Sequence, residues 1–337
     1  MKIKKGQVER MRRKLMFVIM VIMGLSLGMA GHSYGKETYP TKPVEIVVPY
    51  PPGTTMDLLA RSIGNIAPKY LGQPVVPVNK PGAGGSPAAA EVIAAKPDGY
   101  KIMMTTNFFF ASTTKTQRVP FNPYTLVPVV NFLEYRNGML VKGDSSYKTL
   151  NDLLDFGRKN PGKLRWGHSG RGTTQHMYGL LLFRKAKVET IDIPYKGSPD
   201  MISAVLGGHI EAAFVTYGAT TDHVRSGTLR YVITVGEKRY SNSPNVPCAP
   251  ELGYPEMTKL PTYVGLYVHK DTPEPVKKIL LDAMTKTYQD AEFQKRLEAL
   301  AEEPKFAGPD AMRETIKTSE AAAEPMLKEF GLWVEGK

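Results

Sequence analysis

Two copies of the tripeptide Gly-Thr-Thr, at residues 53–55 and 172–174, each stand between a strand-like run and a helix-like stretch. The run before the first copy is Val44–Val48, and the run before the second is Leu164–Trp166. Such a turn exposes backbone N–H groups and hydroxyls at a helix N-terminus, which is a favourable place for an anion. The two turns therefore suggest two domains that close on one negatively charged ligand, although Gly-Thr-Thr is also a common helix cap.

Strand-like and helix-like segments alternate along the chain. Apolar runs typical of strands lie at residues 44–48, 75–78, 101–104, 138–141, 164–167, 210–215, 229–235 and 264–268. Apolar residues at helical spacing follow both Gly-Thr-Thr copies, and we expect the first of these helices to begin at Leu58. This alternation predicts the α/β class with largely parallel sheets, whose ligands bind beyond the carboxyl ends of the strands.

The first 35 residues are typical of a secretory signal peptide. Seven basic residues between Lys2 and Lys14 precede an apolar run from Leu15 to Leu27, and small residues follow. The run is shorter than the ~20 residues that span a bilayer, and we place cleavage after Gly35. The alternative is an uncleaved N-terminal anchor. Cleavage would make this an exported protein.

Charge and cysteine content narrow the possible partners. The formal net charge is +12, and the leader, with seven basic residues and one acid, holds half of it. The remaining basic residues are scattered, which argues against nucleic acid and suits a small anionic ligand. Cys248 is the only cysteine, so no intrachain disulfide can form. The glycine-rich turn at residues 81–86 lacks the spacing of a dinucleotide site, and we expect no cofactor.

A series of short motifs runs through the whole mature chain. They are Tyr39–Pro43, Ile46–Pro49, Pro52–Asp57, Ala60–Arg61, Asn79–Gly85, Pro97–Tyr100, Asn160–Leu164, Ser169–His176, Pro194–Gly197, Gly207–Gly208, Gly227–Arg230, Asn245–Pro247 and Glu251–Pro255. In this order they resemble the extracytoplasmic solute receptors of tripartite tricarboxylate transporters, the TctC or Bug family.

That resemblance implies a two-lobed periplasmic-binding-protein (Venus-flytrap) fold. Its crossover segments would lie near Tyr135–Gly138 and Leu260–Gly265. Residues 36–137 and 260–337 would form lobe 1, and residues 138–259 lobe 2. The implied function is capture of a small organic carboxylate in the periplasm (a di- or tricarboxylate or an aromatic acid) and its delivery to membrane permease subunits. Such a receptor performs no chemistry, and we expect a monomer.

The resemblance also implies which residues bind the ligand, chiefly through backbone amides, hydroxyls and ordered water. The candidates follow the first strands of the two lobes or neighbouring strands, and they are Gly53, Thr54, Thr55, Asp57, Asn107, Phe108, His168, Ser169, Gly170, Gly172, Thr173, Thr174, Tyr195, Gly197, Thr216 and Tyr217. Some have a structural alternative. Asp57 can cap its helix or pair with Arg61 at i+4, whereas Phe108 and Tyr195 can be packing residues.

Four departures from the family pattern leave the identity of the ligand open, and one of them is the unusually aromatic Phe108-Phe109-Phe110 after Asn107. Thr54 stands where a second glycine is usual, and His168 replaces a small polar residue. The second crossover carries Tyr263-Val264-Gly265 instead of a tryptophan before the glycine.

Two other classes of protein have weaker support. His168 and His176 match no metal-ligand spacing, and no Cys or acid pair completes the set, so we expect no metal site. Ser169 and His176 suggest a periplasmic serine hydrolase as an alternative, but the second glycine of G-x-S-x-G and the usual order of the triad are both missing. A sensor that presents its closed form to a signalling partner would need the same ligand clamp as a transport receptor.

Overall fold

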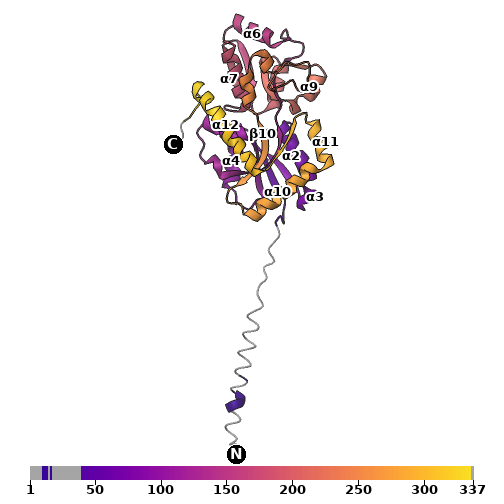
Figure 1. Ribbon diagram of the computed structural model, residues 1–337, viewed down its shortest axis with the longest axis vertical. Helices are drawn as coiled ribbons and strands as arrows, with labels where there is room; N and C mark the ends of the chain where they lie inside the picture. Colours follow the sequence, from indigo (N-terminus) through magenta and orange to yellow (C-terminus); the bar gives the residue numbers. More distant parts are fainter. Residues whose placement is uncertain (1–9, 14–15, 17–38, 335–337) are drawn as a thin grey trace, which may run out of the picture. The chain divides into compact units, whose positions relative to one another are not determined.

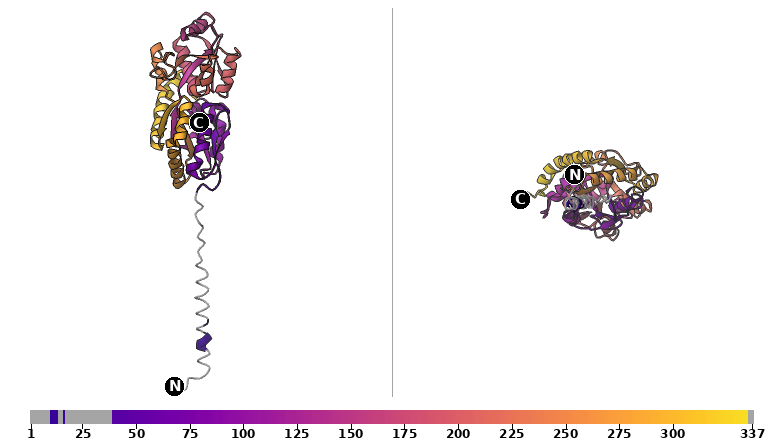
Figure 2. Two further views of the ribbon diagram at one scale, coloured as in Figure 1. Left: turned by 90° about the vertical axis from the view of Figure 1, so that its right-hand side faces the viewer. Right: turned by 90° about the horizontal axis from the view of Figure 1, so that it is seen from below.

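The computed structural model describes residues 10–13, 16 and 39–334, so the predicted signal peptide lies almost wholly outside the described residues. Within residues 39–334, six strands form one sheet in the order β11-β4-β10-β3-β1-β2, and five form a second in the order β7-β6-β8-β5-β9. Figures 1 and 2 show the first sheet in indigo to orange and the second in magenta to salmon. Each sheet belongs to one lobe of the two-lobed fold that the sequence predicts.

The strands of the first sheet are β1 (Val44–Val48), β2 (Val75–Asn79), β3 (Lys101–Thr106), β4 (Leu126–Glu134), β10 (Tyr263–His269) and β11 (Glu303–Ala307). Those of the second are β5 (Asn137–Lys142), β6 (Leu164–His168), β7 (Thr190–Pro194), β8 (Ala212–Thr216) and β9 (Leu229–Thr234). The helices are α2 (Thr55–Ile66), α3 (Pro68–Leu71), α4 (Ser86–Ala94), α5 (Asn107–Ala111), α6 (Leu150–Lys159), α7 (Thr174–Lys185), α8 (Ser198–Leu206), α9 (Thr221–Arg225), α10 (Glu274–Gln289), α11 (Ala291–Ala299) and α12 (Pro309–Glu329).

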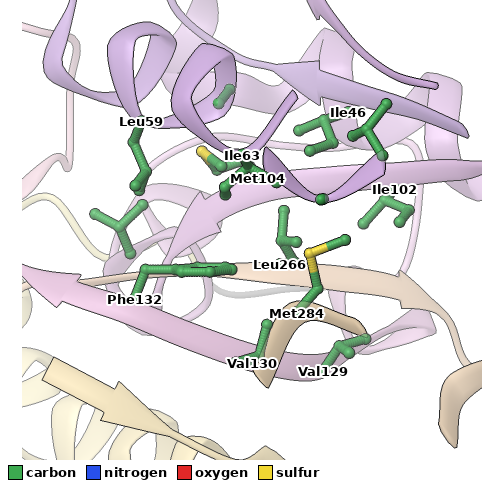
Figure 3. Close-up of a cluster of buried hydrophobic side chains, with 14 of the residues drawn as sticks. Ile46, Leu59, Ile63, Ile102, Met104, Val129, Val130, Phe132, Leu266 and Met284 are labelled. Carbon is green, nitrogen blue, oxygen red and sulfur yellow. The ribbon is translucent and has the colours of Figure 1, made fainter. Parts of the chain in front are cut away.

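Helices cover both faces of the first sheet because successive side chains of a strand point to opposite faces. On one face, strand residues such as Ile46, Ile102 and Leu266 pack against α2, α10 and α11. Figure 3 shows this core, with Leu59 and Ile63 of α2 and Met284 of α10 next to the strands. The residues between them on the strands, among them Val47, Met103 and Tyr267, form a second core with α4, α5 and α12.

The second sheet is built in the same way. Trp166, Met139 and Phe214 point toward α6 and α7, whereas Leu140, Ala213 and Val215 point toward α8. The core on the α7 side also contains Phe108, Ala323, Leu327 and Leu332. These four come from α5, α12 and the segment that follows α12, which otherwise accompany the first sheet. The C-terminal end of α12 thus packs against the second lobe, and the predicted limits at residues 138 and 259 stay a prediction.

Both sheets are mixed, so the expectation of largely parallel sheets is wrong. β1 pairs in parallel with β2 and β3, and β6 with β7 and β8, whereas β10 is antiparallel to β3 and β4, and β5 is antiparallel to β8 and β9. Two of the strands with antiparallel neighbours, β5 and β10, lie next to the crossovers, and the edge strand β11 is also antiparallel to β4. β5 follows β4 after only Tyr135 and Arg136, and β10 is where the chain returns to the first sheet. Alternating strand-like and helix-like segments predict parallel strands that are connected by helices. They do not show where the chain crosses from one sheet to the other.

Three strands were not expected from the sequence. β7 and β11 lie at the edges of their sheets and contain few buried residues, which removes the apolar signal. β4 has an apolar pattern, but Pro128 lies within it, and proline is normally unfavourable inside a sheet. Among the described residues, no helix is both long and apolar enough to cross a membrane.

Candidate functional site

The first Gly-Thr-Thr turn joins β1 to α2. Thr54 is the N-cap of α2; its hydroxyl donates to the Pro51 carbonyl at 3.0 Å and accepts from the Asp57 amide at 3.3 Å. Gly53 has a left-handed backbone with φ +83°, and its N–H donates to Asp57 Oδ2 at 2.9 Å. The helix therefore begins at Thr55 rather than at Leu58, because the cap lies one turn earlier than expected.

The second turn joins β6 to α7 with nearly the same geometry. Thr173 is the N-cap; its hydroxyl donates to the Gly170 carbonyl at 2.8 Å and accepts from the His176 amide at 3.4 Å. Gly172 has φ +74°, and its N–H donates to His176 Nδ1 at 3.1 Å. In both turns the glycine amide is thus held by the side chain four residues later, an aspartate in the first and a histidine in the second.

The two turns and the N-terminus of α8 meet at one cavity between the lobes. Thr54 and Thr55 of α2, Thr173 and Thr174 of α7, and Gly197 and Ser198 of α8 all line it. The N-terminal end of a helix carries a partial positive charge and unpaired N–H groups, so three such ends favour an anion in this cavity.

The cavity encloses about 560 Å³ of space between atoms, part of it open to solvent. Of the described residues, those that line it carry no charged side chain; they are Tyr50, Thr54, Thr55, Gly84, Thr105, Thr106, Phe109, Thr113, Tyr135, Asn137, Ser169, Thr173, Thr174, Gln175, Gly197, Ser198, Thr216 and Thr262. Burial raises the pKa of Tyr50 to about 12, so its hydroxyl keeps its proton at neutral pH. The walls therefore offer hydroxyl, amide and backbone donors without a cationic side chain.

The structure brings seven of the predicted residues to the cavity, namely Thr54, Thr55, Ser169, Thr173, Thr174, Gly197 and Thr216. The others lie behind it or away from it. Asp57, which is 1 % exposed, accepts hydrogen bonds from Gly53 and Arg61, both at 2.9 Å, and from Asn79 at 2.8 Å. Burial raises the pKa of Asp57, but these hydrogen bonds outweigh it and hold the pKa below its usual value. Asp57 therefore has the structural role that the sequence offered as an alternative, because it pairs with Arg61 four residues later.

Asn107 and Phe108 also make contacts that hold the fold together, and they do not line the cavity. The Asn107 side chain donates to the Pro261 carbonyl and to Ser319, and it accepts from the Tyr263 amide, which ties α5 to the second crossover. Phe108 lies in the core of the second lobe, whereas its neighbour Phe109 lines the cavity.

The remaining predicted residues support the site from outside the cavity. Tyr217 stacks on Tyr231 with ring centroids 4.2 Å apart, and Tyr195 packs against the core beside α8. Gly53, Gly170 and Gly172 shape the two turns without lining the cavity, and His168 lies behind the second turn.

His168, His176 and Asp192 form a cluster behind the second turn. Asp192 Oδ2 lies 3.2 Å from His168 Nε2 and 3.5 Å from His176 Nε2. The sequence analysis found no Cys or acid pair to complete a ligand set, and it missed Asp192 because β7 was not expected. Their ligand atoms lie close enough to hold a metal ion. However, the Gly172 amide donates to His176 Nδ1, which places the ring proton on Nε2, where it faces Asp192 and blocks metal coordination. The three groups are better explained as hydrogen-bonded support for the turn.

The hydrolase alternative lacks the contact that it needs. The Ser169 hydroxyl donates to Gln175 Oε1, and both ring nitrogens of His176 are engaged elsewhere, by Gly172 and Asp192. A serine nucleophile requires a hydrogen bond to its base. This pair therefore does not form the nucleophile and base of a serine hydrolase.

Sequence reasoning missed several residues of the cavity wall. Thr105 and Thr106 end β3, and Tyr50 follows β1, so the rule that ligands bind beyond the carboxyl ends of strands could have found them. Gly84 belongs to the glycine-rich turn that we assigned no role. Tyr135 and Asn137 flank the first crossover, where only the folded chain shows which side chains face the cavity.

Two lobes with a polar cavity between them define a solute-binding protein of the periplasmic-binding type. The chain belongs to the TctC family: the sequence model described as "Tripartite tricarboxylate transporter family receptor" matches residues 59–332. It is similar to the UPF0065 protein in the gbd 5' region of Cupriavidus necator, with 32% identity over 86% of this chain and 89% of the relative. It also resembles the protein BugT of Bordetella pertussis, with 27% identity over 88% and 92% of the two chains.

Solved structures agree with this assignment. The periplasmic binding protein BugD matches with a TM-score of 0.83 and 28% identity, over 88% of this chain and all of that one. The R. palustris protein Rpa4515, solved with adipate, matches with a TM-score of 0.80 and 25% identity, over 87% of this chain and 98% of that one.

Proposed function

We propose that this chain is a periplasmic receptor that captures a small organic carboxylate between its lobes and delivers it to a tripartite tricarboxylate-type membrane transporter. The observation that carries the proposal is the convergence of Thr54 and Thr55 from one lobe with Thr173 and Thr174 from the other on a single cavity. A ligand that contacts both turns stabilises the closed arrangement, which is the state a permease would recognise.

The chemistry of the wall favours a carboxylate. A carboxylate only accepts hydrogen bonds, and the wall supplies hydroxyls, the side-chain amides of Asn137 and Gln175, and three helix N-termini. Helix termini and amide donors can stabilise an anion without a cationic partner. A related structure that contains adipate supports the same class of ligand. Membership of the receptor family and the predicted leader support the periplasm and the permease partner.

A melting-temperature panel tests the proposal. The panel holds succinate, glutarate, adipate, citrate, benzoate and aspartate, each at increasing concentration, followed by calorimetry of the acid with the largest shift. At a concentration of 100 Kd, binding should add about 2.7 kcal/mol to the free energy of unfolding. A panel without any shift would overturn the proposal.

A matched pair of variants locates the site. Thr173→Val should weaken binding of the best acid about tenfold or more, because it removes a hydroxyl and the cap of α7 from the cavity wall. Thr318→Val makes the same chemical change on the exposed face of α12 and should leave Kd unchanged. Equal affinities for the two variants would place the ligand elsewhere.

A further inference from the structure

Glu302 is a buried carboxylate behind the cavity. It lies between α11 and β11 and is 3 % exposed. Oε1 accepts from the Gly218 amide at 2.9 Å and lies 3.4 Å from Thr55 Oγ1, and Oε2 accepts from the Arg136 amide at 2.5 Å. These partners come from the segment after β8, from α2 and from the first crossover. One side chain therefore joins both lobes and the link between them.

No cationic side chain of the described residues forms an ion pair with this carboxylate. The nearest candidate, the Arg136 guanidinium, pairs with Glu303 instead. A buried carboxylate without a cationic partner pays a large desolvation penalty when it ionises. Glu302 can thus exist either as an anion or as a neutral acid, and its hydrogen bonds differ between the two forms.

A chain of hydroxyls connects Glu302 to the cavity. Thr55 Oγ1 lies 2.8 Å from Thr216 Oγ1, either hydroxyl could be the donor, and both residues line the cavity. Each hydroxyl has a single proton to donate. The protonation state of Glu302 therefore decides the direction of every hydrogen bond in this chain.

When Glu302 is ionised, the Thr55 hydroxyl donates to Oε1. The Thr216 hydroxyl must then donate to Thr55, so Thr216 offers only lone pairs to the cavity. When Glu302 is protonated, its proton must lie on Oε1, because Thr55 is the acceptor within reach. Thr55 then donates to Thr216, and the Thr216 hydroxyl is free to donate to a carboxylate ligand.

We propose that Glu302 is a positioning residue whose proton, passed through the Thr55 hydroxyl, turns Thr216 into a hydrogen-bond donor for the bound carboxylate. This inference rests on the proposed function, since it concerns the same cavity. Capture of the anion is coupled to uptake of a proton by Glu302. The ligand is therefore bound as an organic carboxylate together with one proton, and its affinity falls when Glu302 loses that proton.

The surroundings place this titration in an accessible pH range. Burial raises the pKa of Glu302 to about 8, although the Gly218 and Arg136 amides and the charge of Arg136 oppose the shift. The other ionisable groups that face it are Arg136, which stays paired with Glu303, and four tyrosines, Tyr135, Tyr217, Tyr231 and Tyr240. Burial raises the pKa of each tyrosine well above 10, so none of them titrates between pH 6 and 9.5.

Calorimetry across pH tests the coupling. The probe is the acid among succinate, glutarate and adipate that gives the largest melting shift. For the wild-type protein, Kd should rise about 30-fold between pH 7 and pH 9.5, and about half a proton should be taken up on binding at pH 8, measured in buffers of different ionisation enthalpy. Glu302→Gln cannot lose the proton, so its Kd should stay constant over this range with no proton uptake.

Two further variants separate positioning from mere stability. Thr55→Val interrupts the hydroxyl chain and should reduce the pH dependence, whereas Thr55→Ser keeps a hydroxyl and should restore it. Circular dichroism confirms that each variant is folded at each pH. A wild-type Kd that does not change with pH, or an equal pH dependence in Glu302→Gln, would overturn the coupling while leaving carboxylate capture intact. If none of the six acids in the melting-temperature panel binds at any pH, the proposed function fails and the coupling fails with it.

Discussion

In the first turn the glycine amide donates to a carboxylate, Asp57, and in the second it donates to an imidazole, His176. The caps, the positive φ angles and the hydroxyl contacts are otherwise nearly the same. The turn therefore needs an acceptor at the fourth position after the glycine, and the two lobes supply it with different chemistry. The carboxylate is held by Arg61 and Asn79, whereas the imidazole is held by Asp192.

The two turns also differ in the space around their glycines. A Cβ on Gly53 would lie 3.8 Å from its nearest neighbour, an atom of Pro199. A Cβ on Gly172 would lie 2.3 Å from Thr116 Oγ1 and 3.1 Å from the Thr113 Cα. The second turn is thus packed against the segment that follows α5, whereas a Cβ on Gly53 would make only an ordinary van der Waals contact. The same local geometry is therefore held more tightly in the second lobe.

The largest difference should appear when each glycine is replaced by alanine. Gly172→Ala combines a left-handed backbone with a steric clash and should cost about 3 kcal/mol or more of unfolding free energy. Gly53→Ala has only the backbone strain, about 1–2 kcal/mol. Urea unfolding measures both. Equal losses would mean that Thr116 moves aside without cost, and the contrast between the turns would disappear.

The second largest difference in stability is expected for Asp57 and His176, the side chains that accept hydrogen bonds from the two glycine amides. Asp57→Ala leaves the Gly53 amide and Asn79 without their acceptor and should destabilise the protein by about 2–3 kcal/mol, because the lost hydrogen bonds involve a buried charge. Asp57→Asn keeps one oxygen and is the matched control, with a smaller loss. His176→Ala removes bonds of a neutral ring and should cost about 1–2 kcal/mol. If His176→Ala loses more unfolding free energy than Asp57→Ala, the imidazole and not the carboxylate is the stronger of the two hydrogen-bond acceptors.

The cap hydroxyls should have similar, smaller effects. Thr54→Val and Thr173→Val each remove an N-cap and should each cost about 1 kcal/mol. The corresponding serine variants keep the hydroxyl and should recover most of the stability. If only one of the two valine variants is destabilised, the turns are not equivalent.

The smallest effect is a difference in pH dependence. Burial lowers the pKa of His176, so the fold favours the neutral ring, and this stability is present above pH 6.5 and is lost as the pH falls below it. The pKa of Asp57 is also lowered, but its contribution is lost only below its ordinary value of 3.8. Between pH 6.5 and pH 5 the wild-type protein should thus lose stability that His176→Ala does not lose. Parallel curves for the two proteins in chemical unfolding would show that His176 does not titrate there.

Local patterns and family-like motifs along the chain were sufficient for much of the fold and for seven of the eighteen residues that line the cavity. Apolar runs located β1, β3, β6 and β10, and the two Gly-Thr-Thr copies located α2 and α7, because strand period and helix capping act over a few neighbours. The two Gly-Thr-Thr turns could be predicted for the same reason. The family could also be recognised from the sequence, because its motifs are short and occur in a fixed order along the chain.

The tertiary structure alone decided which of these residues face the cavity and which support it. Asp57 and Thr54 are three residues apart, yet only Thr54 lines the wall, because the i+4 bond to Arg61 turns Asp57 away. Asp192 and Glu302 gave no signal in the sequence, because their partners lie on other elements of the fold. Glu302 meets Thr55 only after α11, α2 and the first crossover have packed together, because the two residues are 247 positions apart in the sequence. Contacts of that kind depend on how the lobes close, which is a property of the packed core and not of any local pattern.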